Sequence, residues 1–318
     1  MYAGNIMIRN NIYYMPQIKE LIKDYSKGTN YNSEVIPTGI DGLDKIIGGL
    51  HLGRIHTVAG RPCMGSSAFA ITLLRNIGVR SNMPSAMLVS SFGVYDALKR
   101  LYATECGYCS DDDFNRLLVE GDGMEDRNVE HLREAQERLK EIGFYPQGEN
   151  RMFWKQMSQA PIWIEPMETM NIDLLVTQLE HLKNDCGVKI VIIDKLDFLT
   201  PAAGYNGNHA YMSKLHNAVQ RLNIALVITA GLSHTLEYRG GTMRPRLSDL
   251  HGGYYHETFS SVVMFLYRPE YYHIYEDEEG STQGKAELIV AKNNYGPIDN
   301  IRLTFRRCCS FEEVRLRT

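Results

Sequence analysis

The sequence predicts an α/β domain with a mostly parallel central sheet flanked by helices. From Ile36 onward, apolar runs rich in β-branched residues alternate with helical segments. Near-continuous apolar strands separated by helices are typical of a parallel sheet that is buried on both faces. The chain has 318 residues, of which 44% are hydrophobic and 23% charged, which is enough for one large core with a small appendage.

The elements follow one another in a regular order. A short helix is predicted over residues 16–27, because its apolar residues share one helical face, and a polar, Gly/Pro-containing linker follows it. The expected division is therefore 1–30 for an N-terminal segment and 31–318 for the main domain. The later strands follow one another closely, which favours antiparallel pairing there. The predicted strands are RIHTVAG (54–60), SAMLVSS (85–91), APIWIEP (160–166), VKIVIIDKLDF (188–198), IALVITAGL (224–232), SSVVMFLY (260–267), AELIVAK (286–292) and NIRLTF (300–305).

Composition excludes several classes of protein. The formal net charge is −4, so a nucleic-acid contact has to come from a local basic patch. No apolar run approaches a membrane span, and the first residues lack the features of a signal peptide, so a cytoplasmic protein without a membrane partner is expected. Six cysteines are too few for a disulfide scaffold, and no spacing indicates a structural metal site.

One glycine-rich stretch indicates a phosphate site. Residues 60–67, GRPCMGSS, have the spacing G-x-x-x-x-G-K-[ST], except that Ser66 stands where the pattern requires lysine. A strand precedes the stretch and a helix follows it, so backbone N–H groups at the helix N-terminus would face an anion. The predicted nucleotide-binding residues are Gly60, Arg61, Pro62, Cys63, Met64, Gly65, Ser66 and Ser67.

A carboxylate about 130 residues further on suits the same site. The apolar strand KIVIID ends in Asp194, the usual arrangement for a residue that holds the shell of a magnesium ion. Ser67 supplies the hydroxyl that such loops give to magnesium. Ser67 and Asp194 are therefore the predicted metal residues if a nucleotide binds, and Asp194 is also a catalytic candidate.

The order of these segments and their amino-acid sequences resemble the C-terminal, RecA-like motor domain of the DnaB family of replicative helicases, over about residues 31–318. KaiC- and RadA-type relatives share the opening but lack two of the later blocks, so they rank second. The family's larger N-terminal domain is expected to be absent, and the helix 16–27 takes the place of its linker helix. The segments that carry the resemblance are IPTGIDGLDKIIGGLHLGRIHTVAGRPCMGSSAFA, IVIIDKLDFL, RPRLSDL, SSVVMFLYRPEYY and AELIVAKNNYGP.

The resemblance implies a RecA-like P-loop NTPase fold, with residues 31–318 as the helicase motor domain. It also implies ATP and Mg²⁺ as cofactors, single-stranded DNA as a partner, and self-assembly into a homo-oligomer such as a hexameric ring. A host replication helicase or an initiator protein is a further expected partner.

The chain differs from the family at positions whose side chains take part in nucleotide binding and ATP hydrolysis. Ser66 replaces the phosphate-binding lysine, and Ser91 or Phe92, depending on register, replaces the glutamate that positions water. Gly231 replaces the sensor glutamine. In AKNNYGP, Lys292 matches one member of the finger pair that acts on a neighbouring subunit, while Asn294 replaces the arginine. Nucleotide binding is expected to be weakened and ATP hydrolysis impaired, as in a pseudo-ATPase.

A basic loop is the candidate DNA contact. Residues 238–253 place Arg239, Arg244 and Arg246 in a glycine-bearing segment with no acidic side chain before Asp249, the type of loop that grips a phosphate backbone. A solvated loop explains the same residues equally well. The function predicted is that of a DnaB-like helicase-family protein of replication or of a mobile element, acting through assembly or DNA binding. The alternatives are an active ATP-dependent DNA helicase and a regulatory module that binds a host helicase.

Overall fold

The computed structural model describes residues 34–106, 156–157, 159–167, 171–196, 204–239, 243–251, 253–278, 280–306 and 310–314. The chain divides into two units, Met1–Glu34 and Val35–Thr318, and every element described below belongs to the second. The predicted helix over residues 16–27 lies outside the described residues. The predicted boundary between residues 30 and 31 stays a prediction.

One large sheet organises the described part of Val35–Thr318. It has nine strands in the order β13-β12-β11-β8-β3-β7-β6-β4-β5, and two small two-stranded sheets pair β1 with β2 and β9 with β10. The strands are β1 (Val35–Ile36), β2 (Leu50–His51), β3 (Arg54–Gly60), β4 (Ser85–Val89), β5 (Ile162–Pro166), β6 (Ile190–Asp194), β7 (Ala225–Gly231), β8 (Ser260–Tyr267), β9 (Glu276–Asp277), β10 (Gly280–Ser281), β11 (Lys285–Asn293), β12 (Asn300–Arg306) and β13 (Ser310–Glu313).

The pairing confirms the predicted mixture of directions. From β8 to β5 every neighbouring pair is parallel, and β8–β11, β11–β12 and β12–β13 are antiparallel. Parallel neighbours need crossover segments, and the helices between these strands supply them. The mostly parallel α/β fold predicted from the sequence is therefore the fold observed.

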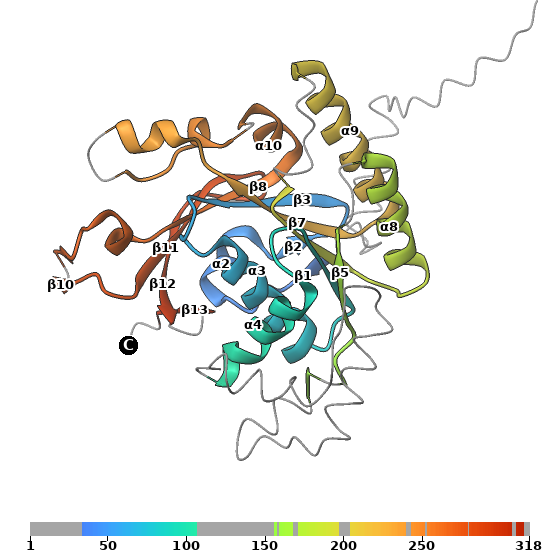
Figure 1. Cartoon of the computed structure of the whole chain (residues 1–318), viewed down its shortest axis with the longest axis horizontal. Helices are drawn as coiled ribbons and strands as arrows, with labels where there is room; N and C mark the ends of the chain where they lie inside the picture. Colours follow the sequence, from blue (N-terminus) through green and yellow to red (C-terminus); the bar gives the residue numbers. More distant parts are fainter. Residues whose placement is uncertain are drawn as a thin grey trace, which may run out of the picture. The chain divides into compact units, whose positions relative to one another are not determined.

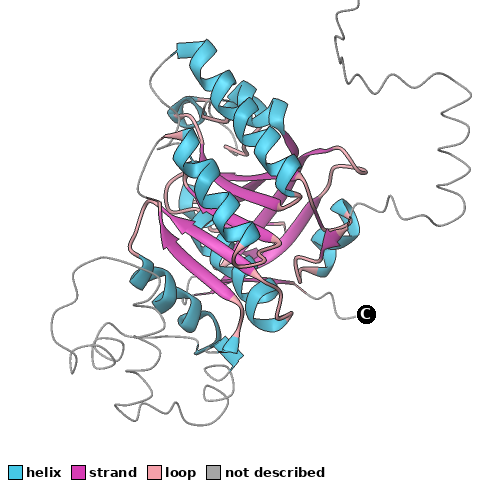
Figure 2. Ribbon diagram, turned by 90° about the vertical axis from the view of Figure 1, so that its right-hand side faces the viewer, coloured by secondary structure: helices cyan, strands magenta, loops and turns pink. Residues whose placement is uncertain are grey.

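Helices cover both faces of the sheet, as Figure 1 and Figure 2 show. In Figure 1, α2, α3 and α4 lie on one side of the strands and α8, α9 and α10 on the other. The helices are α2 (Asp41–Ile47), α3 (Ser66–Leu74) with its π-helical continuation η1 (Arg75–Arg80), α4 (Val94–Cys106), α8 (Ile172–Asn184), α9 (Gly204–Leu222), α10 (Gly253–Phe259) and the 3-10 helices η3 (His234–Tyr238), η4 (Leu247–Asp249) and η5 (Pro269–Tyr272).

Strand β6 contributes side chains to the hydrophobic cores on both faces of the sheet. Its side chains alternate, because successive Cβ atoms of a strand point to opposite faces. Ile190 and Ile192 belong to the core that packs on α3, whereas Val191 and Ile193 belong to the core that packs on α8 and α9. All four are fully buried, so the strand has no polar position before its last residue.

The parallel strands end at one edge of the sheet. Gly60 at the end of β3 pairs with Gly231 at the end of β7, and Val89 at the end of β4 pairs with Asp194 at the end of β6. Ligands of open α/β sheets bind at the carboxyl ends of the strands, so this edge is where a site is sought. Among the described residues, no helix is both long and apolar enough to cross a membrane.

Candidate nucleotide-binding site

The predicted phosphate loop joins β3 to α3. β3 ends at Gly60 and α3 begins at Ser66, as the sequence pattern requires. Two residues between them have positive φ, Cys63 at 66° and Gly65 at 100°, and the helical ladder starts with the Phe69 amide donating to the Gly65 carbonyl at 2.8 Å. The first turn of α3 contains no acidic residue. The backbone therefore keeps a form suited to an anion.

Side chains from the C-terminal strands pack against this loop. A Cβ on Gly65 would lie 2.8 Å from Cζ of Phe311 and 3.3 Å from Cε2 of Phe305. Phe311 is 1% exposed, and its ring meets that of Phe69 edge-on, with 5.8 Å between centroids. Two residues later, Glu313 accepts the Gly42 amide with both carboxylate oxygens at 3.0 Å. Glycine at 65 is thus required by conformation and by space.

The remaining loop residues divide between surface and interior. Pro62 and Cys63 are exposed, Met64 is buried, and Ser66 and Ser67 are half-buried. The Ser66 hydroxyl lies 2.8 Å from the point that a Cβ on Gly60 would occupy, so the residue in the lysine position packs close to the end of β3. A hydroxyl in that position brings no positive charge to a bound phosphate.

Asp194 is fully buried, and both of its carboxylate oxygens accept hydrogen bonds from hydroxyl groups. Thr229 donates to Oδ1 at 2.9 Å and Ser91 to Oδ2 at 2.5 Å. The adjacent Ser90 donates to the Asp194 backbone carbonyl at 2.6 Å. Of the two residues that the sequence leaves open for the glutamate position, Ser91 contacts Asp194, whereas Phe92 lies under the Arg100 guanidinium, 4.3 Å from ring centroid to Cζ. Which of them takes that position stays a prediction.

Thr229 is a site residue that sequence reasoning missed. It is fully buried, donates to Asp194, and accepts the Lys195 amide at 2.7 Å. Lys195 itself has a φ of 61°, so the chain turns sharply directly after β6. The signal in the sequence was that Thr229 is the one polar residue in the apolar run ALVITAG, and a buried hydroxyl needs a partner.

The predicted magnesium ligands are one hydroxyl, of Ser67, and one carboxylate, of Asp194. Among the described residues, no group of three or more His, Cys, Asp or Glu side chains could hold a metal. Asp194 is 0% exposed, and each of its carboxylate oxygens accepts a hydrogen bond from a hydroxyl. Mg²⁺ in proteins is usually held by only one or two carboxylates together with water and substrate phosphates. The assignment of Ser67 and Asp194 to a metal stays a prediction, and no chemical step is assigned to the ion.

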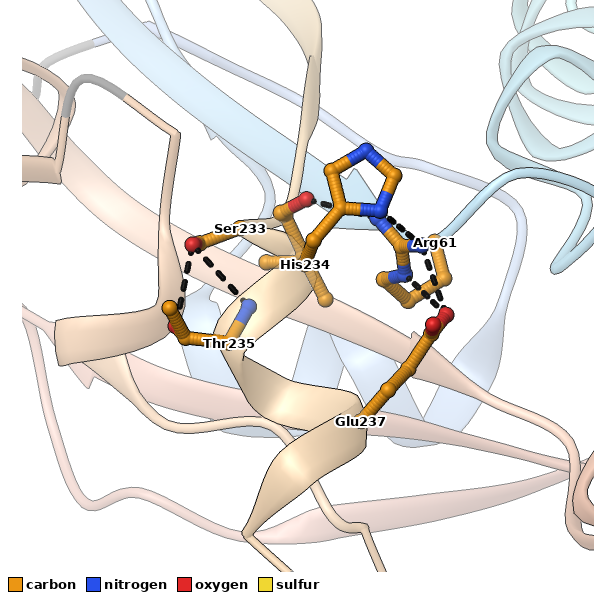
Figure 3. A network of polar contacts seen from close by, with 6 residues as sticks. Arg61, Ser233, His234, Thr235 and Glu237 are labelled. Atoms are coloured by element: carbon orange, nitrogen blue, oxygen red, sulfur yellow. Dashed lines mark hydrogen bonds and ion pairs between the residues drawn. The ribbon is translucent and has the colours of Figure 1, made fainter.

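Arg61 reaches from the loop into the segment after β7 (Figure 3). Its guanidinium donates to the Leu232 carbonyl at 3.0 Å, to Nδ1 of His234 at 3.0 Å, and to Oε1 of Glu237 from two nitrogens, at 2.6 and 3.0 Å. The side chain of Arg61 is only 6% exposed. The residue thus directs its cation into its own chain and away from solvent.

Lys292, the predicted finger, also bonds within its own chain. Its ammonium donates to the backbone carbonyls of Glu257 at 2.6 Å and Ser260 at 2.8 Å. Burial lowers the pKa of Lys292, and the nearby Glu257 opposes this shift. Asn294, in the arginine position, is exposed. A role for Lys292 on a neighbouring subunit stays a prediction, and it would require these two bonds to break.

Two of the three arginines proposed for DNA are paired with carboxylates. Arg239 donates to both oxygens of Asp249, at 3.0 and 2.8 Å. Arg244 makes a bidentate ion pair with Glu287. Arg246 is exposed and lines a groove of about 590 Å³. The loop is therefore less basic than the sequence alone suggests, and DNA binding by these residues stays a prediction.

A comparison with known protein families identifies the fold that carries this site. The family described as DnaB-like helicase C terminal domain matches residues 35–313. The chain belongs to the DnaB-like helicase family. The strand, loop and helix at residues 54–74 and the carboxylate at the end of β6 are thus parts of a known motor fold. The resemblance predicted from the sequence is confirmed, and with it the RecA-like fold.

Curated relatives of the DnaB-like family are replicative helicases. The chain is 24% identical over 275 residues to "Replicative DNA helicase DnaB" of Leifsonia xyli and to "Replicative DNA helicase DnaC" of Bacillus subtilis, covering 85% of this chain and 54% of each relative. It is 23% identical over 281 residues to a "Probable plasmid replicative DNA helicase" of Chlamydia psittaci, covering 86% and 54%. The chain thus spans about half the length of the curated relatives it matches.

Solved structures agree on the fold. An ATPase domain of known structure matches with a TM-score of 0.71 and 22% identity, covering 95% of this chain and 99% of that one. A DnaB-like replicative helicase, whose structure was determined with its interactions with primase, matches with a TM-score of 0.71 and 22% identity, covering 96% of this chain and 68% of that one. At this identity the likeness establishes the DnaB-like motor fold alone.

Proposed function

We propose that this DnaB-like chain acts in DNA replication or in the replication of a mobile element, through assembly and DNA binding, with impaired ATP hydrolysis. In this proposal a nucleotide binds weakly at residues 60–67. The bound nucleotide orders the motor domain and is not hydrolysed as an energy source. Residues 31–318 form the motor domain, and residues 1–30 carry the segment that contacts a neighbouring copy.

The contact between Ser91 and Asp194 carries the proposal. ATP hydrolysis needs a group that orients and deprotonates the attacking water. Ser91 and Phe92 are the two residues that can stand where the resemblance implies glutamate. Ser91 offers a neutral hydroxyl, and that hydroxyl donates to Asp194 at 2.5 Å. A serine held in this way is a poor base, so the step that activates water lacks its side chain.

Three other positions support slow hydrolysis. Ser66 brings no cation to the phosphates, Gly231 has no side chain that can contact them, and Lys292 donates to carbonyls of its own chain. An arginine finger alone supplies about 10³–10⁵ in rate. When several contributions to the rate of ATP hydrolysis are missing together, hydrolysis is slow, and nucleotide binding is the activity that remains.

The names of the relatives support a role in DNA replication. The names of the curated relatives refer to replicative DNA helicases, and one of them to a plasmid helicase. One DnaB-like relative was solved with its interactions with primase. In line with the resemblance, we propose a homo-oligomeric ring, such as a hexamer, as the working form and single-stranded DNA as the polymer it holds. A host helicase or an initiator protein is the proposed protein partner.

Turnover and binding measured on the full chain test the proposal. We expect no DNA-stimulated ATP hydrolysis above background, and calorimetric binding of ATP that depends little on Mg²⁺. Asp194→Asn is the matched control, because it removes the carboxylate and should leave the already low rate unchanged. Turnover of about 1 s⁻¹ or faster, lost in Asp194→Asn, would establish an active ATP-dependent enzyme instead.

A further inference from the structure

The loop that joins β11 to β12, residues 294–299, is fastened to the segment between α2 and β3. Tyr295 in this loop stacks on the ring of His51 in β2, with 3.4 Å between the ring centroids and 12° between the ring planes. The side-chain amide of Asn293, the last residue of β11, donates to the Ile46 carbonyl at 2.9 Å, and its Oδ1 accepts the Tyr295 amide at 3.0 Å. Stacked rings stabilise a contact beyond the area that they bury. The stack on His51 therefore holds the middle of the loop in place.

His51 is held in turn by His56, which lies in β3. The His51 amide donates to Nε2 of His56 at 3.2 Å, and the His51 ring donates from its own Nε2 to the Ile47 carbonyl at 3.0 Å. Because Nε2 of His56 accepts, the neutral ring of His56 has its proton on Nδ1, which lies 3.4 Å from the Leu226 carbonyl. His56 is 0% exposed. The bond between the two residues therefore exists only while Nε2 of His56 has no proton.

The surroundings of the two histidines disfavour a positive charge. Burial lowers the pKa of both rings, to about 3 for His56, and the Arg54 guanidinium adds to this effect at His51, as His51 does at His56. A proton on Nε2 of His56 is therefore accommodated only when β2 moves away and water reaches the ring. The groups that face the pair from other elements include no carboxylate among the described residues, and they are the Ile47 carbonyl of α2, the Leu226 carbonyl of β7 and the Tyr295 phenol of the loop.

We propose that protonation of His56 releases the loop 294–299, which makes this loop an acid-sensitive segment of the domain surface. A proton from solvent that binds Nε2 of His56 removes the acceptor of the His51 amide, so β2 moves and the ring of His51 no longer supports Tyr295. The loop then loses the contact that holds its middle. Asn294 lies in this loop, where the resemblance implies a finger that acts on a neighbouring subunit, so the release changes the surface that such a subunit meets. That consequence rests on the proposed function, whereas the release is a property of the single chain.

Hydrogen exchange of the full chain at pH 7 and pH 5, corrected for the intrinsic rate at each pH, tests the release. The readout is the acid response, defined as the ratio of the opening constant at pH 5 to that at pH 7 for the amides of His51 and of residue 295. A histidine whose pKa is 6.5 in the open state and about 3 in the closed state raises the opening constant about 25-fold between these pH values. We therefore expect an acid response about 25 times larger in wild type than in His56→Gln, whose side chain stays uncharged. Adding about 1 M urea should change these opening constants little, because a local opening exposes little surface.

Variants of the stack test whether His51 transmits the change to the loop. In Tyr295→Ala we expect the amide of residue 295 to lose the acid response, because the loop is no longer tied to β2, while the His51 amide keeps it. Tyr295→Phe keeps the ring and should behave as wild type at both amides. Since Tyr295 is 39% exposed, these variants test the proposal even if His56→Gln fails to fold. His216→Gln is the matched control, because His216 is half-buried in α9, outside these contacts, and burial lowers its pKa as well.

The outcomes separate a local release from other effects of acid. Equal acid responses in wild type and His56→Gln, a response lost in His216→Gln, or a response of residue 295 that survives in Tyr295→Ala would each overturn the proposal. A response at both amides that changes with urea as the amides of β6 do would show global unfolding and would also overturn it. The proposal is supported by the difference between wild type and His56→Gln together with the separation of the two amides in Tyr295→Ala. These results do not depend on nucleotide or DNA, so failure of the proposed function would leave them unchanged.

Discussion

The Ser91 hydroxyl donates a hydrogen bond of 2.5 Å to Oδ2 of Asp194, a carboxylate that is 0% exposed. Ser91→Ala removes this donor and leaves a buried charged oxygen without it. We expect the free energy of unfolding to fall by about 1–3 kcal/mol, measured by chemical denaturation. Ser248→Ala, at an exposed serine, is the control and should change stability little. An unaltered stability in Ser91→Ala would mean that water replaces the hydroxyl and that the pair matters less than its geometry suggests.

Ser66→Lys should restore affinity for nucleotide without restoring turnover. The added ammonium supplies a charge-assisted bond to phosphate, worth about 1.5–3 kcal/mol, so we expect the calorimetric Kd for ATP to fall by about tenfold or more. Ser66→Met, similar in length and uncharged, should give no such gain. DNA unwinding by Ser66→Lys would show that the interpretation of Ser91 and Lys292 is wrong.

Arg246 should account for most of the salt dependence of DNA binding by the basic loop. Arg239 and Arg244 already pair with Asp249 and Glu287, so they must exchange one carboxylate for a phosphate. Arg246→Ala is therefore expected to reduce the log–log salt slope for single-stranded DNA by about 0.7, and Arg244→Ala by less. Slopes measured by fluorescence anisotropy decide the matter. A slope that changes only in Arg244→Ala would place the contact at the other end of the loop.

His56 should make the fold sensitive to acid. It is fully buried in β3, where its Nε2 accepts the His51 amide at 3.2 Å, and burial lowers its pKa from 6.5 to about 3. The unfolded chain therefore binds a proton that the folded chain does not. The contribution to stability is complete above pH 6.5 and is lost as the pH falls toward 3, by up to about 1.4 kcal/mol per pH unit.

Chemical denaturation at pH 7 and pH 5 checks this expectation. His56→Gln places an uncharged acceptor near the position of Nε2, so the difference in stability between the two pH values should shrink relative to wild type. The pKa of His51 is lowered as well, chiefly by burial, and it contributes with the same sign. An equal pH dependence in wild type and His56→Gln would assign the acid sensitivity to other groups.

Gly65→Ala should weaken the loop for two separable reasons. The φ of 100° is unfavourable for any residue with a Cβ, and that Cβ would lie 2.8 Å from Phe311. We expect a loss of at least about 1–2 kcal/mol in the free energy of unfolding. In the background of Phe311→Leu the additional loss should be smaller, because the closest ring contact is removed, while the backbone cost and the 3.3 Å contact with Phe305 remain. An equal loss in both backgrounds would mean that the ring moves aside at little cost.

Part of the site could be predicted because its requirements leave a mark in the local sequence. Glycine at 65 follows from its positive φ, and Asp194 is the last residue of an apolar strand whose other four residues are all fully buried. These are constraints within one element and its next turn. The order of strands and helices is read in the same way, which is why the predicted α/β fold agrees with the structure.

The side-chain contacts within the site could not be predicted from local sequence patterns. Arg61 and Glu237 are 176 positions apart, and no local pattern says that one side chain reaches the other. Ser91 and Phe92 lie in the bend after β4, where a shift of one residue decides which of two very different side chains is matched to the family's glutamate. The apparent charge of the loop at 239–246 depended on acids such as Glu287, which is remote in the chain and close in the fold.

Strand β13 gives the domain a late step during its synthesis. Phe311 packs beside Gly65, and Glu313 holds the Gly42 amide from 271 positions away. At about 5–20 residues per second, a ribosome needs roughly 15–50 s after Gly42 before it makes Glu313. During that interval α3 and the loop before it lack the cover that their final packing uses. The nascent chain therefore exposes an apolar surface for most of its time on the ribosome, and chaperones that act there are expected to govern its yield.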